Sequence, residues 1–185
     1  MRDCKDIQFD IEPRQGSVTR RNRNSLINDL KSILVYQKPV EGYDYFLMLD
    51  SDIEFNLSNI EALINHNKDI VCSPYLMHGR EGIYDCGEFL IQGSIKGRYN
   101  EDKKGLHVVD WIGAGFMLMK ASVFEKMEYP WYRNILVRSG DNQEESSEDI
   151  GFCVNAERSN IDVWCDFDNP VGHKKRTHES FDWSF

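Results

Sequence analysis

The run Tyr43 to Asp52 (Tyr-Asp-Tyr-Phe-Leu-Met-Leu-Asp-Ser-Asp) constrains the fold more than any other segment. Its aromatic and aliphatic residues, preceded by Gly42, predict a short buried strand that ends at Asp50. In a strand, side chains i and i+2 point to the same face, about 7 Å apart. We therefore expect Asp50 and Asp52 to stand together at the carboxyl end of a central strand, where open α/β sheets bind ligands.

Two neighbouring carboxylates at a strand end open to solvent suit a hard divalent cation. Such cations take oxygen ligands and often grip substrate phosphates as well. Asp50 and Asp52 are therefore the first candidates for a metal site. The alternative is that the two acids only end the strand and face water.

Composition limits the possible classes of protein. A chain of 185 residues fits one domain, 1–185, with a substantial core. With 22 basic and 31 acidic residues the formal charge is -9, so nucleic acid is not an expected partner. The 5 cysteines form no CxxC pair, which argues against structural zinc and favours reduced thiols in a cytosol-like compartment. Without an apolar run of spanning length or a secretory signal, a soluble cytoplasmic protein is expected.

Strands and helices alternate in the first half of the chain. A strand over Ile7–Ile11 is followed by an amphipathic helix over Ser17–Val35 and then by the strand that ends at Asp50. A helix capped by Ser58 and a strand over Asp69–Tyr75 come next. This β-α-β-α-β order predicts a parallel sheet with helices on its faces.

The second half is less regular. Glycines spread over residues 76–105 predict hairpins and loops. The further predicted elements are a strand-like stretch Val108–Lys120 interrupted by two glycines, a short helix Ala121–Met127, a mobile polar loop 138–147, a helix Ser147–Arg158 and a strand Asp162–Phe167. The expected fold class is α/β, with a three-layer α/β/α arrangement around a mixed, mainly parallel sheet.

Four motifs follow one another in a recognisable order. They are Asp-x-Asp at a strand end, Trp-x-Gly-Ala-Gly at 111–115, Ser-Glu-Asp at a helix start at 147–149, and Val-Gly-His at 171–173 after a strand. In this order they resemble a nucleotide-sugar glycosyltransferase of the GT-A fold, a Rossmann-like fold. The chain is most similar to the inverting family 2 type and to glycosyltransferase domains of large algal viruses, which for a viral protein implies the host cytoplasm.

The resemblance covers Ile7 to His173 and implies an enzyme of glycan biosynthesis. Such an enzyme moves a sugar from a UDP-sugar, or another nucleoside diphosphate sugar, to a hydroxyl of a glycan with inversion. Family members begin with a strand and helix that hold the nucleotide base, whereas Ile7–Ile11 matches their second strand. The first strand-helix unit is therefore expected to be missing, as in a domain truncated at its N-terminus and cut from a longer protein.

The resemblance also implies a metal site. Asp50 would contact the ribose or the metal shell, and Asp52 would bind Mn²⁺ or Mg²⁺ that bridges the diphosphate. His173 would be a further ligand, since neutral imidazole suits Mn²⁺. His178 is the nearest competitor, and an ordinary surface histidine is the alternative reading of His173.

The Ser-Glu-Asp motif has a local explanation as a helix start. Ser147 can cap the helix, and acids in the first turn are favoured by the helix dipole. The resemblance adds a catalytic role, with Asp149 as the general base that takes the acceptor's proton and Glu148 as the alternative base.

Two further groups are expected near the donor. Arg21 and Arg23 fall on basic positions that in the family lie near the nucleotide, and a solvated basic face explains them equally well. The resemblance places Asp110, Trp111 and Gly115 at the floor of the sugar pocket. Core packing at a strand kink is the competing explanation for these three residues.

Three other functions share parts of this pattern. A sugar-phosphate nucleotidyltransferase would need a glycine-rich basic first loop, which is not visible. A haloacid-dehalogenase-type phosphatase expects a Gly-Thr pair after the second acid, whereas Ile53-Glu54-Phe55 follows here. A non-catalytic nucleotide- or glycan-binding domain is the third alternative.

Overall fold

The computed structural model describes residues 43–77, 79–89, 95–139 and 142–174. Its elements are β1 Tyr45–Leu49, β2 Ile53–Glu54, α2 Leu57–His66, β3 Ile70–Cys72, β4 Ile83–Phe89, β5 Ile95–Asn100, β6 Leu106–Val108, β7 Trp111–Ile112, β8 Phe116–Lys120, α3 Val123–Lys126, β9 Leu136–Ser139, β10 Asn142–Glu145, α4 Glu148–Arg158, β11 Val163–Asp166 and β12 Gly172–His173. The predicted strand Ile7–Ile11, the helix Ser17–Val35 and the question of a missing first unit lie outside the described residues.

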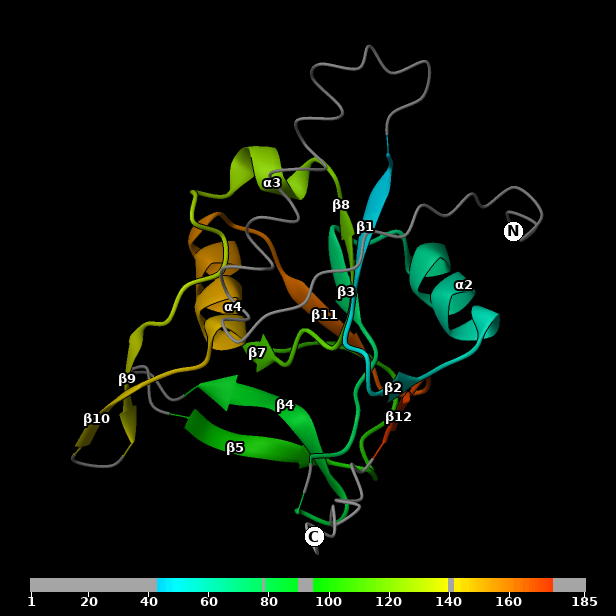
Figure 1. The fold of residues 1–185 in the computed structure, drawn as a ribbon, viewed down its shortest axis with the longest axis horizontal. Coiled ribbons are helices and arrows are strands. Elements are labelled where there is room, and N and C mark those ends of the chain that lie inside the picture. The colour runs from blue at the N-terminus through cyan, green and yellow to red at the C-terminus, as the bar shows by residue number, and fades with distance from the viewer. Residues whose placement is uncertain (1–42, 78, 90–94, 140–141, 175–185) are drawn as a thin grey trace, which may run out of the picture.

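The largest sheet has five strands in the order β1-β8-β3-β11-β6 (Figure 1). Strand β8 runs antiparallel to both of its neighbours, with Leu118 opposite Leu47 of β1 and opposite Val71 of β3. Strand β6 is antiparallel to β11, and within this sheet the pair β3–β11 is parallel. Antiparallel pairing therefore dominates the sheet.

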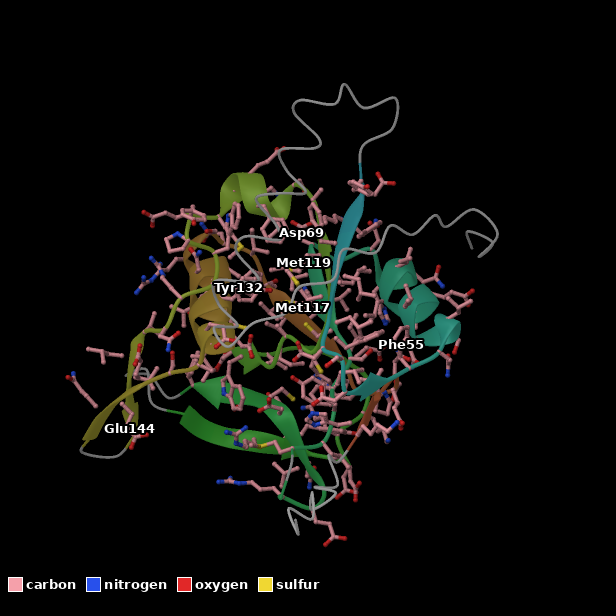
Figure 2. The ribbon with its side chains drawn as sticks, in the orientation of Figure 1. Phe55, Asp69, Met117, Met119, Tyr132 and Glu144 are labelled. Atoms are coloured by element: carbon pink, nitrogen blue, oxygen red, sulfur yellow. The ribbon has the colours of Figure 1, made fainter. Side chains whose placement is uncertain are left out.

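Alternate residues of the buried strands pack on opposite faces of this sheet. Phe46 and Met48 of β1 join the core that includes residues of α3 and α4, whereas Tyr45 and Leu47 pack against the cluster that contains residues of α2. Figure 1 accordingly shows α2 on one side of the sheet and α3 and α4 on the other. The larger core contains Met117, Met119 and Tyr132, which Figure 2 labels in the interior.

Helix α4 begins after Ser147, as the sequence predicts, and approaches the segment before it very closely. A Cβ atom added to Gly151 would overlap the backbone oxygen of Arg133. Only a glycine at this position lets the first turns of α4 pack so tightly, which sets the location of Glu148 and Asp149.

The fold class predicted from the sequence is wrong. The described residues form small antiparallel and mixed sheets with three helices, rather than a three-layer α/β/α fold around a mainly parallel sheet. The prediction assumed that the strand ending at Asp50 and the strand over Asp69–Tyr75 are neighbours because they follow one another in the chain. Instead β8, which comes much later, lies between them and reverses the pairing on both sides.

The remaining strands form three smaller sheets, with the orders β5-β4-β7, β12-β2 and β10-β9. In the first, β4 and β5 correspond to the hairpins expected within 76–105, whereas β7 lies in the strand-like stretch predicted over Val108–Lys120. The mobile loop predicted for 138–147 is wrong in part, because Asn142–Glu145 pairs as β10 with β9. This hairpin extends away from the main sheet, and Figure 2 labels Glu144 of β10.

Helix α2 starts at Leu57 with Asn56 as its cap, two residues before the predicted cap Ser58. In the part of the chain that the structure describes, no helix has both the length and the apolar character needed to cross a membrane.

Candidate functional site

The two acids of the opening motif lie in a turn at the end of β1. Strand β1 ends at Leu49, and the amide of Ile53 donates to the carbonyl of Asp50 at 3.2 Å. The argument that Asp50 and Asp52 share one face of a strand therefore does not apply, because Asp52 is beyond the strand. Their positions are held by other contacts. The Asp50 amide donates to the Gly115 carbonyl at 3.0 Å, and the Lys174 amide donates to the Asp52 carbonyl at 2.8 Å.

His173 lies beside Asp52. Its Nε2 is 3.7 Å from Asp52 Oδ2, and its Nδ1 is 2.9 Å from the backbone carbonyl of Leu76. The short sheet β2–β12 sets this approach by pairing His173 with Ile53. Upstream, the Val171 amide donates to the Pro74 carbonyl at 3.0 Å, so the segment before His173 is held against the segment after β3.

The contact with Leu76 determines which nitrogen of His173 can bind a ligand. A carbonyl oxygen only accepts hydrogen bonds, so Nδ1 must carry a proton. In the neutral imidazole, Nε2 then carries the lone pair and is directed at the Asp52 carboxylate. Backbone carbonyls orient metal-binding histidines in this way in many metal sites.

Tyr75 contacts Gly115 and His173, two of the residues predicted for the site. It is 6% exposed, its hydroxyl accepts a hydrogen bond from the Gly115 amide at 3.3 Å, and its ring centroid is 5.0 Å from that of His173. Burial raises the pKa of the Tyr75 hydroxyl well above its ordinary value, and the carboxylates of Asp85, Asp149 and Asp50 raise it further. The charges of three acids, from β4, the start of α4 and the end of β1, thus act on this buried hydroxyl, and the His173 ring packs against the tyrosine ring.

Asp149 belongs to this group through the start of α4. Besides acting on Tyr75, its charge adds to the effect of burial, the largest cause, in raising the pKa of the Cys153 thiol to about 12. The Cys153 thiol itself lies 3.8 Å from the carbonyl of Ile112. Glu148 precedes Asp149 in the first turn of the helix and is half-buried as well.

The segment predicted as the floor of a sugar pocket lies against Tyr75. A Cβ atom on Gly113 would overlap the Tyr75 hydroxyl and come within 2.6 Å of Asp85 Oδ2, and one on Gly115 would be 3.0 Å from the tyrosine ring. The glycines therefore allow this backbone to lie directly on Tyr75 and Asp85. Asp110 has a local role, since its Oδ2 accepts a hydrogen bond from the Phe89 amide at 2.6 Å.

Trp111 is only 3% exposed, and Arg98 covers its ring with the guanidinium carbon 4.5 Å from the ring centroid. The ring is thus a support for Arg98 rather than an open platform. Among the described residues, its indole nitrogen is buried without a hydrogen-bond partner.

Asp85 and Arg98 are site residues that the sequence analysis did not identify. Arg98 Nη1 donates to Asp85 Oδ1 at 2.9 Å, and both side chains are partly exposed. Each stands in a glycine-rich hairpin region without a motif, so no local signal distinguishes them from surface charges. The predicted residues Arg21 and Arg23 and the competitor His178 lie outside the described residues.

A divalent cation needs several oxygen or nitrogen ligands. Within 43–77, 79–89, 95–139 and 142–174, no three His, Cys, Asp or Glu side chains gather closely enough to hold a metal by themselves. Asp52 and His173 supply one carboxylate and one imidazole, with Asp50 nearby in the same turn. Mg²⁺ and Mn²⁺ are commonly held by one or two side chains together with substrate phosphates and water, so these residues fit such an ion.

The comparisons with known proteins bear on the fold. No family model matches the chain, and no curated protein matches it. Among solved structures, the chain is similar to the crystal structure of A197 from STIV, with a TM-score of 0.53 and 19% sequence identity over 92% of this chain and 82% of that chain. This likeness shows a shared fold and leaves the function to be argued from the site.

Proposed function

We propose that this protein is a metal-dependent glycosyltransferase that transfers a sugar from a UDP-sugar, or another nucleoside diphosphate sugar, to a hydroxyl of a glycan with inversion. The proposal rests on the site and not on the fold, because the arrangement of the sheets differs from the one that the motifs implied.

One observation carries it. Asp50 at the end of β1 and Asp149 at the start of α4 both act on the Tyr75 hydroxyl through their charges, and the His173 ring of β12 packs against the Tyr75 ring. The charges that act on this buried hydroxyl come from carboxylates, a setting that suits a cation or a proton transfer.

Asp52 and His173, with Asp50 in the same turn, would hold the ion and the diphosphate. The chemistry that Mn²⁺ or Mg²⁺ supplies when bound is the neutralisation of charge on the departing nucleoside diphosphate. The carbonyl of Leu76 orients His173, so that Nε2 is presented without a rearrangement of the ring.

Asp149 is the proposed general base. As the acceptor oxygen forms a bond to the anomeric carbon, the bond from that carbon to the phosphate oxygen breaks, and the acceptor's proton passes to the Asp149 carboxylate. The close packing at Gly151 fixes the helix turn that carries this acid, and Glu148 is the alternative base.

The experiment is a titration of UDP and of UDP-glucose, UDP-galactose and UDP-N-acetylglucosamine with and without Mn²⁺, combined with an assay of free UDP. A glycosyltransferase should bind UDP more tightly with Mn²⁺ and release UDP from at least one sugar nucleotide. Binding without UDP release across acceptors would indicate a nucleotide-binding domain. Turnover of a nucleoside triphosphate with a sugar phosphate would indicate a nucleotidyltransferase, and no binding of UDP in any condition would refute the proposal.

A further inference from the structure

The three-stranded sheet β5-β4-β7 contains an unusual cross-strand row. Gly87 of β4 stands opposite Arg98 of β5 on one side and opposite Trp111 of β7 on the other. Because Gly87 has no side chain, Arg98 can reach across it onto the Trp111 ring, with the guanidinium carbon 4.5 Å from the ring centroid. The planar charged group is thereby held flat against the sheet.

Asp85 meets Arg98 at the end of this row. Its Oδ1 accepts from Arg98 Nη1 at 2.9 Å, while its Oδ2 faces the Cα of Gly113 next to the Tyr75 hydroxyl. The backbone of Asp85 is fixed on both sides, since its amide donates to the Tyr75 carbonyl at 3.0 Å and its carbonyl accepts from the Gly113 amide at 2.9 Å. The carboxylate therefore has a defined position beside the candidate site.

The exposure of these groups distinguishes them from a core ion pair. Trp111 is 3% exposed, whereas the Arg98 and Asp85 side chains are 24% and 32% exposed. One hydrogen bond uses only part of the donors of a guanidinium and of the acceptor positions of a carboxylate. A ligand can thus contact a rigid array of donors and acceptors over an apolar base.

Adjacent hydroxyl groups of a sugar ring match this array. Each hydroxyl can donate to a carboxylate and accept from a guanidinium, and charged partners make these the stronger hydrogen bonds. A phosphate at this position would meet the repulsion of the Asp85 carboxylate, which already uses part of the Arg98 charge. The chemistry therefore favours a neutral polyhydroxyl ligand.

We propose that Asp85 and Arg98, supported by Trp111, form a subsite that binds the ring hydroxyls of a sugar. This inference rests on the proposed function and adds to it the residues that recognise a sugar. The sugar can be the one carried by the donor or the one that accepts it, since both present the same hydroxyl chemistry.

The test compares wild-type protein with Asp85→Asn and Arg98→Gln in the presence of Mn²⁺. For the donor, calorimetry measures the affinity of UDP and of UDP-glucose, UDP-galactose and UDP-N-acetylglucosamine. For the acceptor, binding of the matching methyl glycosides is measured with UDP and Mn²⁺ present. We expect both variants to weaken one of the two sugar-dependent affinities by at least about tenfold while the affinity for UDP itself is unchanged.

Asp69→Asn is the matched control. Asp69 forms an ion pair with Lys120 at 3.2 Å at similar exposure, and Figure 2 shows it far from β4 and β5. This control should leave every sugar affinity unchanged. Thermal melting of each variant verifies that it is folded, and if Asp85→Asn is unfolded, Arg98→Gln carries the test.

The outcomes separate the two proposals. A loss confined to UDP-sugars assigns the subsite to the donor sugar, and a loss confined to methyl glycosides assigns it to the acceptor. Unchanged sugar affinities in a variant that still binds UDP with Mn²⁺ would overturn the subsite and leave the proposed function standing. Absence of UDP binding in the wild-type protein would overturn both.

Discussion

His173 Nε2 lies 3.7 Å from Asp52 Oδ2, although the two residues come from opposite ends of the described chain. The separation is longer than a direct hydrogen bond, and the other ring nitrogen is held 2.9 Å from the Leu76 carbonyl. In the proposed metal site the two side chains would be ligands of one ion, with the imidazole oriented by the backbone.

Replacing either member of this pair should weaken the binding of Mn²⁺. Asp52→Ala and His173→Ala each remove a proposed ligand, and we expect at least a tenfold loss of Mn²⁺ affinity and a loss of metal-dependent UDP release, since even outer partners of metal sites cost about 10- to 100-fold. Calorimetry with Mn²⁺ in the presence of UDP measures the affinity. Asp44→Asn, an exposed acid before β1, is the control. Unchanged turnover in Asp52→Ala would refute the metal assignment.

The general base is tested by exchanging each acid at the start of α4. Asp149→Asn should bind UDP-sugar with Mn²⁺ as the wild type does, while sugar transfer falls by about 10²- to 10⁴-fold, because an amide cannot take the acceptor's proton. Glu148→Gln, the neighbouring change in the same helix turn, should transfer sugar nearly normally. If instead Glu148→Gln loses transfer and Asp149→Asn does not, the role belongs to Glu148.

The close contact between Gly113 and Tyr75 predicts coupled effects on stability. Gly113→Ala places a methyl group against the Tyr75 hydroxyl, and we expect a loss of about 1–3 kcal/mol in the free energy of unfolding. Tyr75→Phe removes that hydroxyl and the hydrogen bond from Gly115, at a cost of about 1 kcal/mol. In the double variant, removal of the Tyr75 hydroxyl relieves part of the clash. The loss of stability of the double variant should therefore be smaller than the sum of the losses of the two single variants.

Urea denaturation of the four proteins measures this coupling. The clash is not fully relieved in the double variant, because Asp85 Oδ2 also lies 2.6 Å from the added methyl position. Strictly additive losses would show that Gly113 and Tyr75 do not share the packing that the structure describes.

The pH dependence of stability should include a contribution from Asp69. Partial burial raises the pKa of this carboxyl, but hydrogen bonds and charges from Lys120 and Lys126 more than offset it, so that its pKa lies below the ordinary value of 3.8. A carboxyl with a lowered pKa in the folded state stabilises the protein above its unfolded pKa, and that contribution disappears as the pH falls through the folded value.

Asp69→Asn should therefore lower the melting temperature at pH 7, by an amount equivalent to less than about 1 kcal/mol for so exposed a pair. Near pH 3 the difference between variant and wild type should shrink. Thermal melting at both pH values makes the comparison. A difference that is as large at pH 3 as at pH 7 would contradict the assigned ion pairs.

Local sequence patterns were sufficient to predict the position of several helices and strands. The apolar run before Asp50 predicts β1, the serine and acids at 147–149 predict the start of α4, and Asp162–Phe167 predicts β11 to within a residue at each end. These features depend on periodicity and capping, which act over a few residues and are therefore visible in the sequence.

The arrangement of these elements was decided by tertiary packing. Strand β8 lies antiparallel between β1 and β3 because its buried residues, among them Met117 and Leu118, fill both faces of the sheet there, and no local pattern specifies which strands a later strand will join. The same limit applies to the site around Tyr75, because no local pattern shows which distant residues pack against this side chain. The sequence alone determined that Asp50, Asp52, Asp149 and His173 are present at the ends of elements. Only the packing of distant backbone segments, through Gly113, Gly115 and the β2–β12 pair, brought Asp52 beside His173, set His173 against Tyr75 and placed Asp85 and Arg98 next to them.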